Sequence, residues 1–355
     1  MSKILLTGGG TAGHVTPNIA LLPYLREAGF EIEYMGSYNG IEKRLIEKEG
    51  IPYTGISSGK LRRYFDLKNV SDPFRILKGY SEAKKYIKRF NPDIVFSKGG
   101  FVSVPVIYAA ADLNIPIVIH ESDLTPGLAN KLSIRKASKI CYTFPETIDF
   151  IPSNKAIHTG LPVRQSLLCG NPHTGYELCG FSEDKPLLMV IGGSLGAACI
   201  NETVRLALDE LLKTFHIAHI CGKDKVNTEY EGIDGYKQFE YVGDELPDLF
   251  AAASLVISRA GSNVIHELLA LKKPSLLIPL GTNQSRGDQI LNAKSFKKCG
   301  YAENLFEDEL SRESLINDVL EVTANRTSYI DAMSKADELF AAHKVVDVIM
   351  DVLGK

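Results

Sequence analysis

Short apolar runs alternate with amphipathic stretches along the whole chain, and this alternation limits the possible folds more than any single motif does. In the first half the runs "KILLT", "EIEYM", "PDIVFS" and "PIVIH" are typical of short buried strands. Residues 17–28 and 102–114 lie between such runs and are typical of helices. This order predicts parallel β-α-β units with helices on both faces of a sheet.

The same pattern begins again after residue 164. The runs "PLLMVI", "HIAHICG", "KQFEYVG", "SLVIS" and "PSLLIPL" predict further strands, with helices over residues 198–214, 262–271 and 286–300. A length of 355 residues fits about two domains. We therefore expect an α/β fold of two Rossmann-like, doubly wound domains linked near "HTGLPVR", residues 158–164. A last helix over residues 327–353 has its own apolar stripe and is expected to return to the first domain.

Composition excludes several classes of protein. The chain is 45% hydrophobic and 23% charged without a low-complexity tract, as globular proteins are. Its six cysteines form no C-x-x-C pair, so we expect reduced thiols and no metal site. No signal peptide precedes the first apolar run, and no run approaches the ~20 residues of a membrane span. We expect a protein that stays inside the cell.

Basic residues are concentrated in the first half of the chain. Residues 1–163 carry 21 Lys and Arg against 15 Asp and Glu, whereas residues 164–355 carry 19 against 28. Residues 60–89 hold ten basic and three acidic side chains. In this segment apolar and basic side chains are interleaved: Phe65, Leu67, Phe74, Ile76 and Leu77 with Arg62, Arg63, Lys68, Arg75 and Lys78. The pattern suits docking on anionic lipid, and the alternative is a solvated helix whose apolar side joins the core. Nucleic acid is not an expected partner.

Four glycine-containing loops follow predicted strands, at residues 8–13, 98–101, 192–197 and 259–263. In doubly wound sheets ligands bind outside the carboxyl ends of the strands, where helix N-termini favour anions. The first loop reads G-x-G-x-x-G, the fingerprint of a dinucleotide site, which requires an acidic residue at the end of the second strand. That position is Gly36, and His14 follows the loop directly. We therefore expect no nicotinamide or flavin, and no other cofactor.

Two domains with such loops are expected to face each other across a cleft, one holding a nucleotide diphosphate and the other an acceptor. A histidine at this cleft titrates near neutral pH and can deprotonate a hydroxyl nucleophile, so His14 is the candidate catalytic base. The alternative is a structural histidine that caps the start of the following helix.

Taken together, the motifs resemble those of a known family. "GGGTAGHVTPNIAL", "FSKGGFVSVP", "IPIVIHESDLTPGLANK", "TGLPVR", "VIGGSLGAACIN", "ISRAGSNVIHELLAL" and "SRGDQILNA" resemble, in order and spacing, the family 28 glycosyltransferases. Within that family they resemble the branch that adds N-acetylglucosamine to lipid I in peptidoglycan synthesis. The resemblance covers nearly the whole chain. It implies the two-domain GT-B architecture, UDP-N-acetylglucosamine and lipid I as substrates, inversion at the anomeric centre and no tightly bound metal.

The resemblance also implies a division of roles. Residues 1–161 with a C-terminal helix of about residues 337–355 would form the acceptor-binding, membrane-facing domain, and residues 164–336 the donor-binding domain. The enzyme would be peripheral on the cytoplasmic face of the cell membrane, with the anionic inner leaflet and cell-wall or division proteins as partners. Thr11, Ala12 and Gly13 would line the cleft beside His14, and Gly99 and Gly100 would hold the acceptor diphosphate.

The remaining residues follow from the other motifs. Substrate-binding positions by resemblance are Asp123, Arg164, Ser194, Val242, Gly261, Ser262, Asn263, Glu267 and Gln289, with Asn292 nearby. Glu267 corresponds to a ribose-binding glutamate, Gln289 to a glutamine that reads sugar hydroxyls, and Val242 to a backbone contact with uracil. Asp123 stands where many members have Asn, so it either binds a sugar or assists His14.

Three other functions share parts of this pattern. A diacylglycerol glycosyltransferase and a UDP-N-acetylglucosamine 2-epimerase have the same architecture. A non-catalytic subunit that binds nucleotide sugars is the third, although His14 and Glu267 argue against it.

Overall fold

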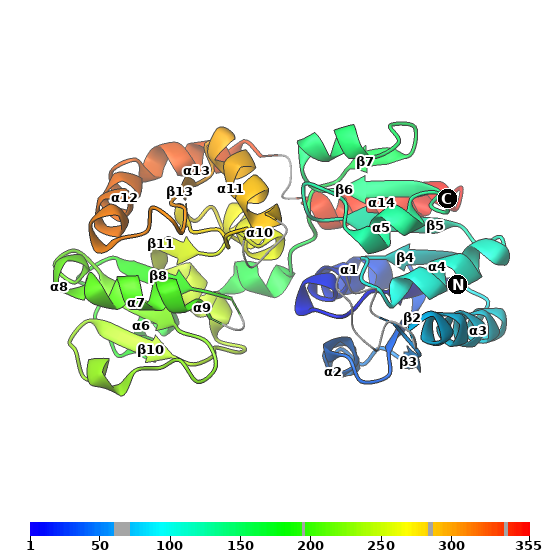
Figure 1. The fold of residues 1–355 in the computed structure, drawn as a ribbon, viewed down its shortest axis with the longest axis horizontal. Coiled ribbons are helices and arrows are strands. Elements are labelled where there is room, and N and C mark those ends of the chain that lie inside the picture. The colour runs from blue at the N-terminus through cyan, green and yellow to red at the C-terminus, as the bar shows by residue number, and fades with distance from the viewer. Residues whose placement is uncertain (60–71, 194–195, 283–286, 337–339) are drawn as a thin grey trace. The chain divides into compact units, whose positions relative to one another are not determined.

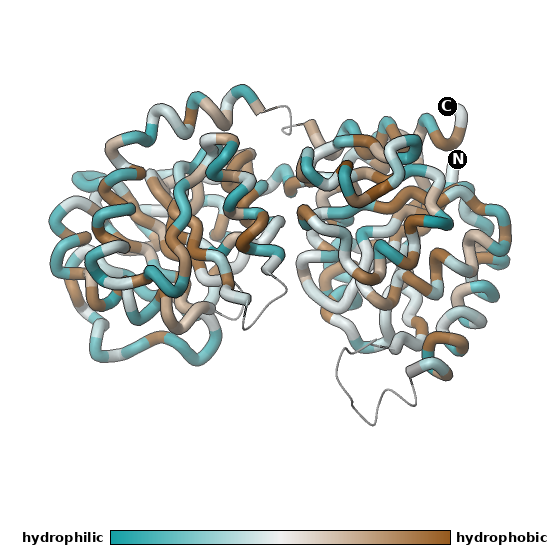
Figure 2. The backbone as a smooth tube through the Cα atoms, turned by 45° about the horizontal axis from the view of Figure 1, so that its top comes forward, coloured by the Kyte–Doolittle hydropathy of each residue, from teal (hydrophilic) through white to brown (hydrophobic). Residues whose placement is uncertain are grey.

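The computed structural model describes residues 1–59, 72–193, 196–282, 287–336 and 340–355. The chain divides into two compact units, Met1–Arg164 with Asp337–Lys355, and Gln165–Ala336 (Figure 1). Apolar segments run through the middle of each unit, and hydrophilic residues lie on the outer helices and loops (Figure 2). Each unit therefore has its own core.

The first unit is built on a seven-stranded parallel sheet with strand order β3-β2-β1-β4-β5-β6-β7. Its strands are β1 (Ser2–Thr7), β2 (Phe30–Ser37), β3 (Tyr53–Ile56), β4 (Ile94–Ser97), β5 (Ile117–Glu121), β6 (Lys139–Tyr142) and β7 (Ala156–His158). Its helices are η1 (Ala12–His14), α1 (Thr16–Glu27), α2 (Ile41–Lys48), α3 (Asp72–Phe90), α4 (Ser103–Asp112), α5 (Leu128–Ser133), η3 (Pro145–Phe150) and α14 (Ala341–Val352). The order reverses at β1 and β4, which places the loops after these strands at the switch point of the sheet.

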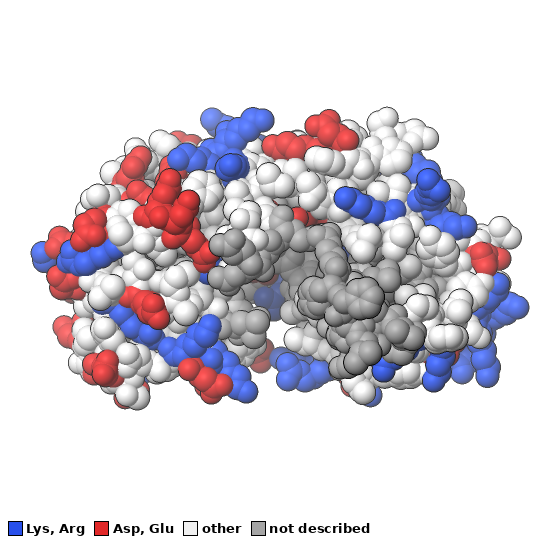
Figure 3. Space-filling view, in the orientation of Figure 1, with Lys and Arg blue, Asp and Glu red and all other residues white. Residues whose placement is uncertain are grey.

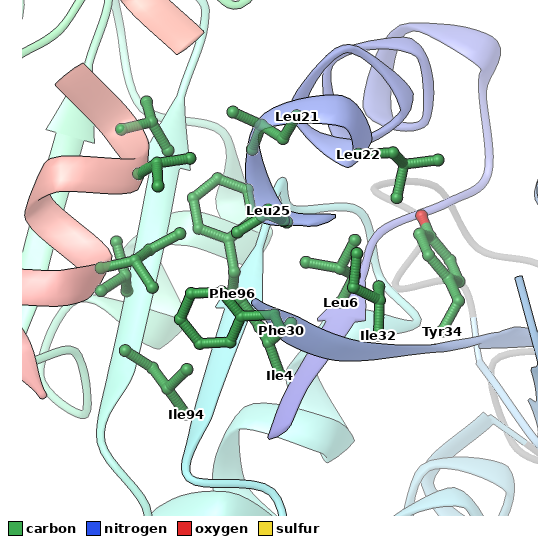
Figure 4. Close-up of a cluster of buried hydrophobic side chains, with 14 of the residues drawn as sticks. Ile4, Leu6, Leu21, Leu22, Leu25, Phe30, Ile32, Tyr34, Ile94 and Phe96 are labelled. Carbon is green, nitrogen blue, oxygen red and sulfur yellow. The ribbon is translucent and has the colours of Figure 1, made fainter. Parts of the chain in front are cut away.

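Alternate residues of β1 are buried on opposite faces of this sheet. Ile4 and Leu6 lie in one apolar cluster with Leu21 of α1 (Figure 4). Val345 of α14 belongs to the same cluster, while Leu5 lies in a second cluster with residues of α3 and α4. Strands covered on both faces have the near-continuous apolar sequence that "KILLT" shows.

The second unit has a six-stranded parallel sheet with strand order β10-β9-β8-β11-β12-β13. Its strands are β8 (Leu187–Ile191), β9 (His216–Ile220), β10 (Tyr236–Phe239), β11 (Ala253–Ser258), β12 (Ser275–Leu277) and β13 (Glu303–Asn304). Its helices are η4 (Gln165–Cys169), α6 (Pro172–Cys179), α7 (Ala198–Leu206), α8 (Leu208–Leu211), η5 (Thr228–Tyr230), α9 (Leu246–Ala252), α10 (Ser262–Ala270), α11 (Asp288–Lys298), α12 (Arg312–Ala324) and α13 (Arg326–Ser334). The two doubly wound sheets predicted from the alternation are confirmed.

Two expected helices differ from the structure. The helix expected over residues 198–214 is broken at Ala207, whose φ of −100° and ψ of 0° leave the helical region between α7 and α8. The single helix expected over residues 327–353 is wrong, because α13 ends at Ser334 in the second unit and α14 begins at Ala341 in the first. The chain passes from one core to the other between them, and a continuous helix could not bury both apolar stripes as observed.

Candidate functional site

The loop after β1 folds back on itself around His14. The ring Nδ1 of His14 lies 3.1 Å from the carbonyl oxygen of Gly9 and 3.1 Å from the hydroxyl of Thr11. A carbonyl oxygen can only accept a hydrogen bond, so Nδ1 carries the proton in the neutral ring. The lone pair is then at Nε2, which is the atom that can take a proton from a substrate. Hydrogen bonds to its own loop are also what a structural histidine makes, so the role of His14 as the base stays a prediction.

A buried carboxylate from α2 supports this loop. Glu42 is 0% exposed, and its carboxylate accepts hydrogen bonds from the amides of Gly10 at 3.2 Å and Ser37 at 3.0 Å and from the Ser37 hydroxyl. The sequence pattern did not single out Glu42, because nothing in "IEKRLIEKE" distinguishes it from a solvated helix residue. It fixes the loop conformation on which the position of His14 depends.

The loop after β4 packs directly against the loop after β1. Gly99 and Gly100 have φ of +93° and +86°, and a Cβ on Gly100 would overlap the carbonyl oxygen of Gly9. Only glycine permits this approach of the two backbones. Ser103, at the start of α4, donates its hydroxyl to the Gly100 carbonyl at 2.7 Å and fixes the turn.

The segment after β5 is organised by Glu121. The amides of Ser122, Asp123 and Gly127 and the side-chain amide of Asn130 all donate to its carboxylate, at 2.8–3.0 Å. Because β1, β4 and β5 are neighbours in the sheet, the structure places His14, Gly99, Gly100 and Asp123 on loops at one edge. The Glu121 carboxylate therefore accepts four hydrogen bonds from its own segment, three from backbone amides and one from Asn130, and fixes the conformation of that segment.

In the second unit the predicted donor loops also follow neighbouring strands. The loop of residues 192–197 follows β8, residues 259–263 follow β11, and residues 278–287 follow β12, and these strands are adjacent in the sheet. Gly261 is the N-cap of α10, with Ser262 and Asn263 as its first residues and Glu267 one turn further along. Ser194 lies outside the described residues. The backbone amides of this helix start, together with its positive dipole end, suit an anion.

Arg259 and Glu307 connect these loops. The Arg259 guanidinium lies 2.6 Å from the Glu307 carboxylate and donates to the Ile278 carbonyl at 3.0 Å. Glu307 also accepts the Gly281 amide at 2.9 Å and the Cys199 thiol at 3.2 Å. Burial alone would raise the pKa of Glu307, but the Gly281 amide and Arg259 outweigh it and the pKa lies below its usual value. The sequence pattern gave no signal for Glu307, which lies in an ordinary acidic loop.

The other predicted residues of this unit are less tightly grouped. Gln289, in α11, accepts the Leu280 amide at 3.0 Å through its side-chain oxygen, and Asn292 donates to the Ala260 carbonyl at 3.3 Å. Both therefore border the loops after β11 and β12. Val242 is buried and follows β10, two strands away from β8. Arg164 is the last residue of the first unit rather than part of the second.

Part of the basic segment lies outside the described residues, namely Phe65, Leu67, Arg62, Arg63 and Lys68. In the described part, α3, Phe74 and Leu77 are 73% and 65% exposed, and Arg75 and Lys78 are exposed beside them. The apolar side of the second half of α3, including Ile87, joins the core. Basic side chains are visible on the side of the first unit where α3 lies (Figure 3). The helix thus serves the core along one half and presents apolar and basic groups to solvent along the other.

None of the six cysteines is joined in a disulfide. Across the described residues, no group of three His, Cys, Asp or Glu side chains is arranged to hold a metal ion. No helix within the described ranges is long and apolar enough to cross a membrane.

Comparison with known proteins identifies the family. The glycosyltransferase family 28 N-terminal domain matches residues 4–142, and the family 28 C-terminal domain matches residues 187–351. The chain belongs to glycosyltransferase family 28. The enzyme class expected from the motifs, a hexosyltransferase, is confirmed.

Relatives within family 28 match over almost the whole chain. The UDP-N-acetylglucosamine--N-acetylmuramyl-(pentapeptide) pyrophosphoryl-undecaprenol N-acetylglucosamine transferase of Lachnospira eligens is 58% identical over 99% of both chains. The protein of the same name from Clostridium botulinum strain Hall is 60% identical over 95% of both chains. The crystal structure of Acinetobacter baumannii MurG superimposes with a TM-score of 0.77 at 26% identity, covering 99% of this chain and 100% of that one. The expected GT-B fold is thereby confirmed.

Proposed function

We propose that this chain transfers N-acetylglucosamine from UDP-N-acetylglucosamine to the 4-hydroxyl of the N-acetylmuramic acid in undecaprenyl-diphosphate-MurNAc-pentapeptide, lipid I. The products are lipid II and UDP, and the anomeric centre is inverted. The observation that carries the proposal is full-length identity of 58–60% to transferases of that name. Each unit has glycine loops at the carboxyl edge of its sheet, so one unit can bind the donor and the other the acceptor.

The second unit binds the donor in this proposal. The diphosphate of UDP lies at the start of α10, where Gly261, Ser262 and Asn263 offer backbone amides at a positive helix end. Ser194 contributes from the neighbouring loop. Negative charge grows on the leaving UDP in the transition state, so the same amides stabilise the bond-breaking step as well as the bound donor.

The remaining contacts select the sugar and the nucleoside. Glu267, one turn into α10, has two carboxylate oxygens for the two ribose hydroxyls. Gln289 uses its side-chain oxygen on Leu280, which leaves its amide nitrogen as the donor toward sugar hydroxyls. The Val242 backbone contacts the uracil, and Arg164, at the boundary of the units, contacts the donor from the chain link.

The first unit binds the acceptor and supplies the base. His14 takes the proton of the 4-hydroxyl at Nε2, the oxygen attacks the anomeric carbon, and the bond to UDP breaks with its electron pair going to the phosphate oxygen. Thr11, Ala12 and Gly13 border the acceptor sugar, and Gly99 and Gly100 hold the acceptor diphosphate. Asp123 binds a hydroxyl of the acceptor. Attack opposite the leaving group accounts for inversion.

Membrane contact is proposed for the first half of α3. Phe74 and Leu77 insert among lipid headgroups while Arg75 and Lys78 face anionic lipid, at about 1 kcal/mol for each basic residue near the surface. The membrane face proposed for this contact is the cytoplasmic one, where the lipid acceptor would be presented. Cell-wall and division proteins that act at the same surface are expected partners.

The decisive experiment measures UDP release by the purified chain with UDP-N-acetylglucosamine and a short-chain lipid I analogue. We expect release only when both are present. Release with diacylglycerol in place of lipid I would identify a lipid glycosyltransferase instead. Turnover of the donor without any acceptor would identify an epimerase, and donor binding without turnover a binding subunit. His14→Ala serves as the inactive control.

A further inference from the structure

Lys98 is the first residue after β4 and lies between the two glycine loops of the first unit. Its amide donates to the carbonyl of Thr7 at 3.0 Å, and its Cβ would be 3.3 Å from a Cβ placed on Gly8. Gly8, Gly9 and Gly10 on one side and Gly99 and Gly100 on the other bring no side chains. Lys98 therefore stands between the two glycine loops at the switch point of the sheet.

The ammonium group of Lys98 is buried and has no hydrogen-bond acceptor among the described residues. The residue is 1% exposed, and Nζ has no partner there. Burial lowers the pKa of Lys98 to about 8, and the negative charges of Glu121 and Asp123 oppose that change. At neutral pH the group thus remains mostly a cation, in a place where a cation without acceptors is costly.

The neighbouring carboxylate does not pair with Lys98 directly. The Glu121 oxygens are already occupied by three backbone amides and the Asn130 side chain. The negative field of the site holds the lysine charged, but no hydrogen bond from the described residues uses its protons.

A half-buried lysine, Lys273, shows what a structural role looks like in this chain. Lys273, in the second unit, also has its pKa lowered to about 8 by burial. Its ammonium donates to the carbonyls of Ala251 and Ala253 at 3.0 and 2.8 Å. The ammonium of Lys273 thus joins its segment to the end of α9 and the start of β11 by hydrogen bonds, whereas the ammonium of Lys98 makes no such bond to the described residues.

We propose that Lys98 supplies the positive charge that binds the diphosphate of the acceptor at the two glycine loops. This inference rests on the proposed function, because it deepens the acceptor site assigned there to Gly99 and Gly100. A phosphate group on these loops would lie in the field of the buried ammonium, in a water-poor setting where charge interactions are strong. The energetic cost of keeping the cation buried is then offset when the anion binds.

The test compares Lys98→Met with Lys273→Met, which remove a buried and a half-buried charge while keeping a similar stem. For Lys98→Met we expect the KM for a short-chain lipid I analogue to rise roughly 10–100-fold, the range for hydrogen bonds to charged groups. We expect the donor KM to stay at its wild-type value and the Tm to stay the same or rise, because the substitution removes a buried charge that has no hydrogen-bond acceptor among the described residues. Lys273→Met should lower the Tm and leave both KM values unchanged. Lys98→Arg keeps the charge and should recover part of the acceptor affinity.

Binding of inorganic pyrophosphate, measured by calorimetry with saturating UDP present to fill the donor site, separates this inference from the transferase activity. The wild-type chain should bind pyrophosphate and Lys98→Met should bind it at least about tenfold more weakly, whether or not lipid I is turned over. Equal binding by the two proteins would overturn the role of Lys98. A lowered Tm of Lys98→Met with matching losses for both substrates, or a rise in the donor KM alone, would overturn it as well.

Discussion

Glu307→Ala is predicted to destabilise the second unit and to weaken donor binding. Arg259 is 9% exposed, and the Glu307 side chain is 20% exposed at 2.6 Å from it. Removing one partner of a buried ion pair costs about 3–5 kcal/mol because the other charge stays buried, and the partial exposure of Glu307 places this case near 3 kcal/mol. For a unit of about 170 residues this corresponds to a Tm lower by about 6–12 °C.

The pH dependence of this loss follows from the lowered pKa of Glu307. A carboxylate whose folded pKa lies below its unfolded value stabilises the fold above the unfolded pKa, here near 4.5. The contribution disappears as the pH falls through the folded pKa. The difference in unfolding free energy between wild type and Glu307→Ala should be constant from pH 6 to 8 and should shrink below about pH 4.5.

Calorimetry over this pH range measures the loss of stability in Glu307→Ala, and steady-state kinetics measures the loss of donor binding. The KM for UDP-N-acetylglucosamine should rise because the loops of residues 259–263 and 278–287 lose their common anchor, while the acceptor KM stays unchanged. Removing both charges, as Arg259→Met with Glu307→Met, should restore much of the stability. The exposed pair of Arg312 and Asp209 is the control, and Asp209→Ala should leave the Tm unchanged. A Glu307→Ala protein with wild-type Tm and donor KM would refute the reasoning.

Three further predictions concern single residues of the proposed site and surface. His14→Ala should lower kcat about 10²–10⁴-fold with a near-normal donor affinity in titration calorimetry, and an unchanged kcat would remove His14 from the chemistry. Glu267→Ala should raise the donor KM about 10–100-fold, since a carboxylate that binds the ribose is lost, and an unaffected KM in UDP-release assays would show that the ribose lies elsewhere. Replacing Phe74 and Leu77 together by serine should reduce co-sedimentation with anionic vesicles about tenfold or more, while soluble-analogue kinetics stay normal. Undiminished sedimentation would exclude this half of α3 from membrane contact.

The strand order and the loops of the site were largely predictable from local sequence. Each glycine loop follows a short apolar run and precedes an amphipathic stretch, so the position of residues 8–13 or 259–263 at a carboxyl sheet edge needs no tertiary information. The strands that the alternation does not predict, β3, β6, β7 and β13, have four residues or fewer. Short length alone does not explain this, because β4, β10 and β12 also have four residues or fewer and were predicted.

The residues that hold the loops in place could not be predicted in this way. Glu42 acts on Gly10, 32 residues away, and Glu307 acts on Gly281, 26 residues away. Each looks like an ordinary surface acid in its own segment. Its function comes from burial, which depends on how distant elements pack and is not encoded in a local period. Lys98 is similar, since only the structure shows that its ammonium is enclosed.

The residue at the end of the second strand explains why the dinucleotide fingerprint of the first loop is misleading. A dinucleotide enzyme keeps a carboxylate at the end of the second strand for the ribose. Here that position is Gly36, and a Cβ on Gly36 would collide with the side chains of Glu42 and Tyr53. The space is filled by a carboxylate that already accepts hydrogen bonds from Gly10 and Ser37. Gly9, which stands at a variable position of the fingerprint, leaves the space that Glu42 fills, and its carbonyl oxygen meets Gly100 of the loop after β4. The Gly9 carbonyl also lies 3.1 Å from Nδ1 of His14, the proposed base. One loop sequence can therefore serve hydride transfer or sugar transfer, and the residues packed around the loop decide which.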